Sequence, residues 1–195
     1  MHRMKSCNCE EETSVETVAL SYNEDSREIY IFGSIDNAVA SQVISAIGQF
    51  ETEGRGNIGL VMCSSGGTEA SGWAIYDALC LSKCKIIGRC YGECMSIAML
   101  VLQGCDSRLV SPNTRLMVHN GTIDLGSTSQ DKISNVNREI ETMTRMYYEK
   151  LAEKSELTVD RIKKLCDNET FMSAEEALKY GLIDGILGQT KKRKR

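Results

Sequence analysis

Histidine is scarce in this chain of 195 residues, which contains only two. His2 stands at the start of the sequence, where chain termini are commonly poorly ordered. Any chemistry that needs an imidazole base therefore has one credible candidate, His119, which ends the β-like run Arg-Leu-Met-Val-His at residues 115–119. A serine precedes it at the end of the run Gly-Glu-Cys-Met-Ser at residues 92–96. The scarcity of histidine thus directs attention to Ser96 and its surroundings.

Long apolar runs and a recognisable secretory leader are also lacking. No charge-free apolar run approaches the ~18 residues that a membrane helix requires, and residues 1–12 carry charges without the apolar core of a signal peptide. Hydrophobic residues make up 42% and charged residues 26% of the chain, which is ordinary for a soluble globular protein. We therefore expect a cytoplasmic protein with no membrane partner.

Nine cysteines, an odd number, fall mostly inside apolar segments. Since export is not expected, we interpret them as reduced, buried, small hydrophobic residues. The spacings that could suggest a metal site are Cys7-x-Cys9, Cys80-x₃-Cys84 and Cys90-x₃-Cys94. None has the spacing of paired zinc knuckles or a histidine nearby, so we expect no metal.

The net charge of −4 argues against a nucleic-acid partner. The basic run at residues 191–195 is the exception. We interpret it as a solvated tail, with a localisation signal or a nucleic-acid patch as the alternative.

One domain accounts for most of the chain. Residues 1–26 are polar and acidic and predict an arm outside the core, residues 27–187 form the expected domain, and residues 188–195 form a basic tail. Internal repeats and low-complexity linkers are absent from the sequence, and its only proline, Pro112, falls in a turn. A second domain therefore has no support.

Three strand-turn-helix units follow one another in the first half. Strands are expected at residues 29–32, 58–63 and 85–90, followed by turns at 33–34, at 64–67 and at Gly92. A helix is expected after each turn. The first is indicated by the helical spacing of Val39, Val43, Ile44 and Ile47, the second runs through Trp73 to about residue 81, and the third runs from Ser96 to about residue 103. This alternation predicts an α/β fold with mostly parallel strands, in which the strand ends carry the chemistry.

The second half begins with expected strands at residues 107–110 and 115–119, followed by a long helix at about residues 128–154 with a candidate capping box at 127–130. Its apolar residues keep helical spacing: Ile133, Val136, Ile140, Met143, Tyr147 and Leu151. The helix either packs on the core of its own chain or projects toward another subunit. A last helix is expected to begin at the capping box of residues 173–176 and to end at Gly181.

The segment around Ser96 has the parts of an acyl-transfer site. A serine hydroxyl needs a neighbouring base to become a nucleophile, and the intermediate needs donors for its oxyanion. Ser96 stands where a turn enters an apolar helix, so the backbone N–H of Ile97 is a candidate donor. Gly67 occupies the analogous turn one unit earlier and offers a second N–H. Each of these patterns by itself also has a purely structural interpretation.

Four blocks of this sequence resemble the proteolytic subunit of Clp protease (ClpP). They are residues 64–67 (Ser-Ser-Gly-Gly), 92–96, 111–119 and 171–184, in the family's order and near its spacing across about residues 27–187. The resemblance implies a ClpP/crotonase-like spiral of β-β-α units with a protruding long handle helix at residues 128–154. It also implies a self-compartmentalised serine protease of two stacked heptameric rings, with no cofactor on this chain and ATP used by a separate ring.

The resemblance assigns roles to individual residues. Ser96 corresponds to the nucleophile, His119 to the general base, and Gly67 and Ile97 to the oxyanion hole. The family's third triad member is an aspartate, and Glu169 stands at that position here. A glutamate can orient an imidazole, although its extra methylene requires a different approach. Asp167 is the alternative.

Other departures lie around the site. Ser65 replaces a proline, Cys94 and Met95 replace small residues before the nucleophile, and Asn-Gly at residues 120–121 replaces a frequent Gln-Pro pair. These changes predict a reshaped S1 region and substrate-aligning strand.

Two further positions bear on the partner. Gly59 and Val61 stand where tyrosines often build the docking pocket for the Clp ATPase unfoldase. We therefore expect weak docking to that partner, because apolar anchors dominate the binding energy of such contacts.

The sequence thus favours a Clp-type serine endopeptidase that cleaves unfolded polypeptides or peptides inside an oligomeric chamber, through an acyl-enzyme on Ser96. The first alternative is a catalytically silent structural ring subunit. The second is a crotonase-like acyl-CoA enzyme, which also uses two backbone N–H donors but needs no serine nucleophile.

Overall fold

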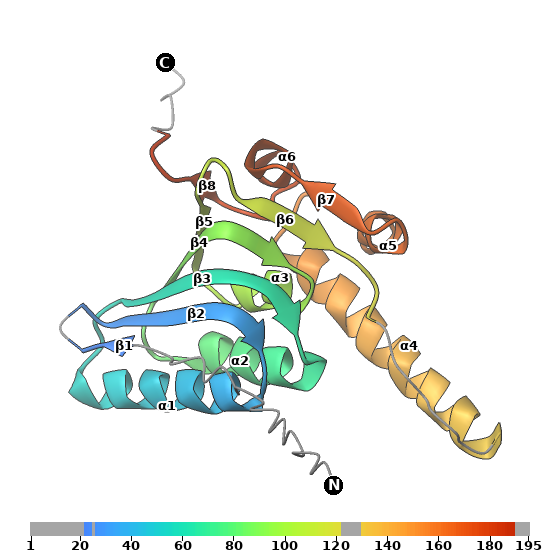
Figure 1. The fold of residues 1–195 in the computed structure, drawn as a ribbon, viewed down its shortest axis with the longest axis horizontal. Helices are drawn as coiled ribbons and strands as arrows, with labels where there is room; N and C mark the ends of the chain where they lie inside the picture. The colour runs from blue at the N-terminus through green and yellow to red at the C-terminus, as the bar shows by residue number, and fades with distance from the viewer. Residues whose placement is uncertain (1–21, 25, 122–129, 190–195) are drawn as a thin grey trace, which may run out of the picture.

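A computed structural model describes residues 22–24, 26–121 and 130–189 (Figure 1). Several segments named in the sequence analysis lie outside the described residues. They are most of the arm expected at residues 1–26, which includes the Cys7-x-Cys9 pair, residues 127–129 of the candidate capping box, and the basic run at 191–195. None of the helices in the described ranges is long and apolar enough to cross a membrane.

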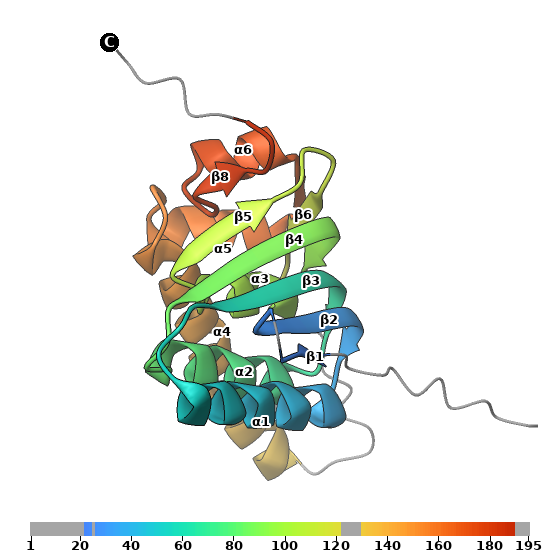
Figure 2. The ribbon, with the colours of Figure 1, turned by 90° about the vertical axis from the view of Figure 1, so that its left-hand side faces the viewer.

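The centre of the fold is a mostly parallel β-sheet (Figures 1 and 2). Its strands are β1 (Tyr22–Asn23), β2 (Glu28–Ile35), β3 (Ile58–Gly67), β4 (Ile86–Met95), β5 (Ser107–Val110), β6 (Arg115–Val118), β7 (Thr170–Met172) and β8 (Gly185–Ile186). They lie in the order β1-β2-β3-β4-β5-β8, while β6 pairs with β4 and β7 pairs with β6. Among these strands, the pairs β1–β2 and β6–β7 are antiparallel and all other pairs are parallel. The prediction of a mostly parallel α/β sheet is therefore confirmed.

Helices connect the strands. They are α1 (Asn37–Glu53), α2 (Glu69–Leu81), α3 (Ile97–Gln103), α4 (Gln130–Glu153), α5 (Val159–Asp167) and α6 (Ala174–Lys179). From β2 to β5 each connection leads to the next strand of the sheet, so right-handed crossovers put α1, α2 and α3 on one face (Figure 2). The expected capping box is present at Ser173 and Glu176, and Gly181 follows the end of α6 with a φ of 71°.

The first three strands run further than expected. β2 continues through Gly33, β3 through Gly66 and β4 through Gly92, so the predicted turns at these glycines are wrong. Their φ values are 92°, 110° and 69°. Glycine adopts such angles without a Cβ clash, so the strand bends and shifts register where another residue would end it. The chain leaves β3 and β4 only at Thr68 and Ser96.

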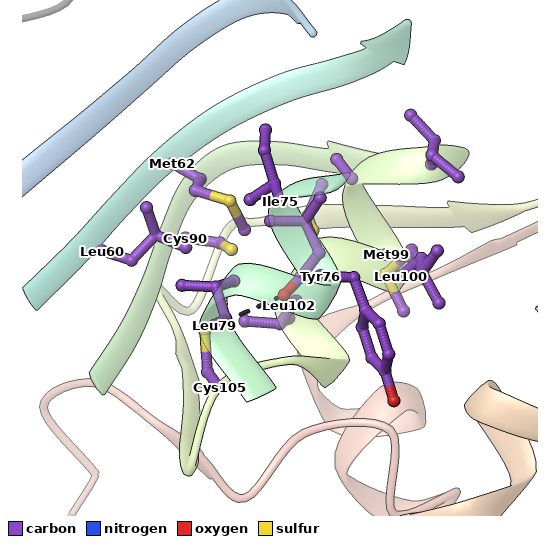
Figure 3. Packing of buried hydrophobic residues seen from close by; sticks show 14 of the residues in the cluster. Leu60, Met62, Ile75, Tyr76, Leu79, Cys90, Met99, Leu100, Leu102 and Cys105 are labelled. Carbon is purple, nitrogen blue, oxygen red and sulfur yellow. Dashed lines mark hydrogen bonds between the residues drawn. The ribbon is translucent and has the colours of Figure 1, made fainter. Parts of the chain in front are cut away.

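The core lies between the sheet and the helices α2 and α3 (Figure 3). Leu60 and Met62 of β3, Ile75 of α2, and Leu100 and Leu102 of α3 are fully buried there. Burying one such side chain contributes about 1.5–3 kcal/mol. In α1 the stripe of Val39, Val43 and Ile47 is buried as expected, whereas Ile44 is exposed.

Most of the cysteines behave as small core residues. The buried ones are Cys84, Cys90, Cys94, Cys105 and Cys166. Cys63 is half-buried, and Cys80 is exposed near the end of α2, so the prediction of burial is wrong for Cys80.

Helix α4 has two parts with different surroundings (Figure 1). Tyr147, Tyr148 and Leu151 are buried near its C-terminal end, where the helix packs on α3 and α5. Its N-terminal half extends away from the sheet, and Ile140 and Met143 there are only half-buried. The side chain of Ile133 lies outside the described residues. The protruding helix is thus confirmed, and its contact with another subunit stays a prediction.

Candidate active site

Strand pairing brings Ser96 and His119 together. Met95, the last residue of β4, pairs with Met117 of β6 in parallel register. Ser96 and His119 therefore directly follow the C-terminal ends of two neighbouring parallel strands. The distance from Ser96 Oγ to His119 Nε2 is 2.7 Å, which is hydrogen-bond distance. When the neutral imidazole carries its proton on Nδ1, Nε2 can accept the hydrogen of the serine hydroxyl.

The backbone of Ser96 is held in an uncommon conformation. Its φ of 55° and ψ of −128° are unfavourable for a residue with a Cβ. The Ser96 N–H donates to the carbonyl oxygen of Met117 at 2.9 Å, and the Ser96 carbonyl accepts from the N–H of Met99 at 3.0 Å. The hydroxyl of Tyr147 donates to the same carbonyl at 3.1 Å. These contacts fix the direction in which Oγ points.

Tyr147 is a residue of the site that the sequence analysis treated only as part of an apolar stripe. Its side chain is buried, and burial raises the pKa of its hydroxyl, so the hydroxyl keeps its proton as a donor even in alkaline solution. A tyrosine in an otherwise aliphatic stripe was the available signal, because a buried hydroxyl needs a hydrogen-bond partner.

The two expected oxyanion donors are Ile97, directly after Ser96, and Gly67, the last residue of β3. Ile97 is the first residue of α3, so its N–H has no acceptor within the helix, and it donates no hydrogen bond within the described residues. The pairing of Ser64 with Cys94 places the end of β3 beside the end of β4. Gly67, at a φ of 155°, packs so closely on Ile35 that a Cβ would lie 2.6 Å from the Ile35 nitrogen.

Gly66 is the glycine whose Cα faces the nucleophile. A Cβ at this position would lie 2.7 Å from the Cβ and 3.2 Å from the Oγ of Ser96. Its N–H donates to Ser64 Oγ at 3.1 Å, which fixes the bend of β3. Gly66 therefore keeps the space around the serine open, a role that the sequence analysis did not assign.

Both candidate carboxylates lie at the same end of the sheet as His119. Val118 pairs with Thr170 at the end of the antiparallel pair of β6 and β7, so His119 and Glu169 are the next residue of each chain segment beyond this pair. Glu169 is exposed, with a φ of 46°. Within the described residues no carboxylate is hydrogen-bonded to His119.

Asp167 is engaged by other partners. Its oxygens accept from Lys163 Nζ at 2.6 Å and from Asn120 Nδ2 at 3.0 Å. These hydrogen bonds, that of Lys163 first, lower the pKa of Asp167. Tyr148 donates to the amide oxygen of Asn120. Asn120, one of the departures noted in the sequence, directly follows His119. Its side chain thus connects the segment of His119 to α4 and α5.

A small cavity of about 20 Å³ opens beside Ser96 and His119. Ile97, Trp73, Met143 and Tyr147 form much of its wall. Cys94 and Met95, which predicted a reshaped S1 region, are not among the residues that line it; Cys94 is buried beneath. Within the described ranges no group of three or more His, Cys, Asp or Glu side chains could hold a metal ion.

The positions expected to weaken docking lie in the first half of β3. The ion pair of Arg89 and Glu28 covers Gly59, and a Cβ there would lie 2.7 Å from the guanidinium. Val61 is buried. Neither position offers an aromatic surface.

The chain is similar in sequence to known proteins over most of its length. A family model described as Clp protease matches residues 11–190, a longer span than the 27–187 expected from the sequence blocks. The chain is 32% identical over 167 residues to the ATP-dependent Clp protease proteolytic subunit 3 of Synechococcus sp. (strain CC9902), covering 83% of this chain and 82% of that protein. It is 31% identical over 166 residues to the ATP-dependent Clp protease proteolytic subunit of Carsonella ruddii (strain PV), covering 83% and 84%.

Among solved structures, a ClpP1 mutant from Listeria monocytogenes has the same fold. The TM-score is 0.78 at 24% sequence identity, and the match covers 85% of this chain and 93% of that one. The prediction of a ClpP-like fold is therefore confirmed.

Proposed function

Since this chain belongs to the Clp protease family, we propose that it is a serine endopeptidase that cleaves unfolded polypeptides or peptides through an acyl-enzyme on Ser96. The observation that carries the proposal is the 2.7 Å contact between Ser96 Oγ and His119 Nε2. A base at this distance can remove the hydroxyl proton as the oxygen attacks a carbonyl.

The proposed reaction has two halves. In the first, Ser96 Oγ bonds to the substrate carbonyl carbon, His119 takes the hydroxyl proton, and the N–H groups of Ile97 and Gly67 stabilise the oxyanion. The C–N bond then breaks, and His119 returns its proton to the leaving amine. In the second half His119 takes a proton from a water molecule that attacks the acyl carbon, and the acid product leaves as Ser96 regains its proton. The reaction needs no cofactor.

The proposal includes an oligomeric chamber. The relatives named above are proteolytic subunits of ATP-dependent proteases, and the half-buried apolar residues of the protruding part of α4 support a subunit contact. ATP would be used by a separate unfoldase ring, whose docking we expect to be weak because Gly59 and Val61 supply no aromatic anchors.

A catalytically silent ring subunit is the second candidate. The observation that favours it is the lack of a hydrogen bond between His119 and any carboxylate of the described residues. A Ser-His pair without an orienting carboxylate loses much of its rate.

Labelling with a fluorophosphonate separates the two candidates. We expect the purified protein to be labelled, and the folded Ser96→Ala variant to remain unlabelled. Ser96→Ala and His119→Ala should each reduce peptide hydrolysis on the order of 10³-fold or more. An unlabelled and inactive wild-type oligomer would support the silent subunit, and hydrolysis by folded Ser96→Ala would exclude this mechanism.

A further inference from the structure

A carboxylate lies in the cavity beside the nucleophile and has no part in the proposed reaction. Glu69 is the first residue of α2, two positions after Gly67, and it lines the same cavity as Ser96 and His119. Its Oε1 lies over the backbone of Gly121, so closely that a Cβ at Gly121 would overlap it. Glu69 is an exposed residue, and its position in the wall of this cavity places a negative charge near the reacting groups.

A second cavity continues from the first. Glu69, Gly121, Met143 and Thr144 line both cavities, so the carboxylate stands where they join. The volume beside Ser96 is about 20 Å³, and that of the second cavity is about 170 Å³. A cavity of about 150 Å³ can hold a benzene molecule. The two together can therefore accept a long side chain that begins at the scissile bond.

Apolar side chains form most of the wall of the second cavity and part of the first, and Glu69 and Glu139 add negative charge. Trp73 and Met143 offer surface to an aliphatic stem, and Val136 and Ile140 continue it in the second cavity. Glu139 adds another carboxylate there. Among the side chains that the structure describes, which leave out those of residues 122–134 and so Lys132, no lysine or arginine forms an ion pair with Glu69 or Glu139. Residues 122–129, which follow Gly121, contain no lysine or arginine in their sequence.

A slot that combines apolar surface with a carboxylate suits a long basic side chain, because the methylene stem can pack on the apolar surface and the cation can pair with the carboxylate. Lysine and arginine pack their methylene stems on apolar surface and keep the cation at the end. A guanidinium or ammonium group also gains from an aromatic face such as that of Trp73. We infer that Glu69 makes this site select substrates with lysine or arginine at the residue whose carbonyl Ser96 attacks. The inference rests on the proposed function and names its substrate class.

The same carboxylate disfavours other side chains. An acidic side chain would be repelled by Glu69 and Glu139. A large apolar side chain would remove water from Glu69 without replacing its hydrogen bonds, which costs free energy. Selectivity for basic residues thus arises from attraction and exclusion together.

Glu69 also suits a purely structural role, because an acidic residue in the first turn of a helix interacts favourably with the helix dipole. That role predicts equal effects on all substrates when the charge is removed. Dependence on the substrate side chain therefore separates the two roles.

The test is a series of fluorogenic peptides that differ only in the residue before the cleaved bond. We expect kcat/KM for arginine and lysine to exceed that for leucine by about tenfold or more, and that for glutamate to be lowest. Glu69→Gln, which keeps the shape and removes the charge, should lower kcat/KM for the basic peptides roughly 10- to 100-fold and raise kcat/KM for the leucine peptide by up to about threefold, because the exclusion of apolar side chains is relieved. The matched control is Asp77→Asn, an exposed acid of α2 that lines neither cavity.

A binding measurement keeps the inference testable without catalysis. Ser96→Ala protein, with and without Glu69→Gln, is titrated with peptides ending in arginine amide or leucine amide. We expect tighter binding of the arginine peptide and loss of that preference with Glu69→Gln. Equal binding of both peptides, or a preference unchanged by Glu69→Gln, overturns the inference, while fluorophosphonate labelling of wild-type Ser96 reports separately on the proposed function.

Discussion

Ser96 has a base within hydrogen-bond distance and a backbone held by contacts from three directions. Its N–H is bound by β6, and its carbonyl is bound by α3 and by Tyr147 of α4. A non-glycine residue at a φ of 55° persists only where the surroundings compensate for its strain. These contacts give the nucleophile one orientation before substrate arrives, which lowers the reorganisation needed for attack.

The carboxylate that would orient His119 leads to the first prediction. Glu169 directly precedes β7, next to the pair of Val118 and Thr170. Asp167, in contrast, accepts hydrogen bonds from Lys163 and Asn120. We expect Glu169→Gln to lower kcat strongly, by up to about 10⁴-fold, with little change in KM. Asp167→Asn should stay within a few-fold of wild type, and Glu169→Asp should keep substantial activity. Steady-state peptide hydrolysis measures all three variants.

A severe loss in Asp167→Asn together with a mild effect of Glu169→Gln would reverse this assignment. If neither variant affects kcat, the site works as a Ser-His dyad. Thermal unfolding of each variant provides the control, since the exposed positions of both residues predict small changes in stability.

Helix α4 connects the protruding part of the molecule to the candidate site. Its buried end places Tyr147 against the backbone of Ser96 and Tyr148 against Asn120, the residue after His119. One helix thus contacts the segments that carry both the nucleophile and the base.

This contact predicts the effect of removing a single hydroxyl. Tyr147→Phe keeps the buried ring but leaves the Ser96 carbonyl with the Met99 N–H as its remaining partner. We expect kcat to fall several-fold, on the order of one hydrogen bond, with KM nearly unchanged, because substrate binding does not use this hydroxyl. Tyr91→Phe, at an exposed position of β4, is the matched control. An unchanged kcat in Tyr147→Phe would show that Ser96 is held without it.

A buried cation joins the C-terminal elements to the sheet. Arg108 of β5 donates to both oxygens of Asp184, just before β8, and to the carbonyl of Lys154 after α4. Burial raises the pKa of Asp184, but the hydrogen bonds from the Arg108 side chain and backbone outweigh this effect, so the pKa lies below its usual value. A group of this kind stabilises the fold above its unfolded pKa, and the contribution is lost as the pH falls through its folded pKa.

Asp184→Asn therefore tests the tie between β5 and β8. We expect the variant to lose about 1–3 kcal/mol of unfolding free energy at pH 7, at the lower end because Asp184 is partly exposed. The difference between variant and wild type should begin to shrink below about pH 4, near the pKa of the unfolded carboxyl group, and should vanish as the pH falls through the lower pKa of folded Asp184. Denaturant unfolding at pH 7 and at a pH below about 4 measures the difference in unfolding free energy between the two proteins. The same difference at both pH values would mean that the charge of Asp184 is not involved.

At the scale of the whole molecule, the protruding part of α4 carries apolar side chains that the described residues of the chain cover only in part. Ile140 is half-buried and borders the outer groove between α4 and α5 as well as the second cavity, and Met146 is exposed. An apolar face of this kind is typical of a subunit contact. The ring that the family implies would supply the missing cover.

Ile140→Glu is expected to yield smaller species than wild type, because a carboxylate would be buried without a partner at the contact. Sedimentation at micromolar concentration measures the assembly. Asn137→Glu, at an exposed position of the same helix, should assemble like wild type. A wild-type protein that sediments as a monomer would contradict the expectation.

Local patterns in the sequence were sufficient for the α/β class, the end of the second helix near residue 81, the capping box at residues 173–176, and the choice of His119. Helical spacing, capping residues and strand alternation act over a few neighbours, and a chain with two histidines offers little choice of base. The sequence could not reveal that the strands continue through Gly33, Gly66 and Gly92, because the same residue also ends strands in turns.

The tertiary structure decided which side chains surround Ser96. The register of β4 on β6 set the 2.7 Å contact with His119. The direction of α4 carried the Tyr147 hydroxyl to the Ser96 carbonyl, and the start of α2 brought Glu69 over Gly121. These contacts join segments far apart in the chain, and their geometry depends on packing of the whole core. No local pattern of residues encodes a distance of that kind.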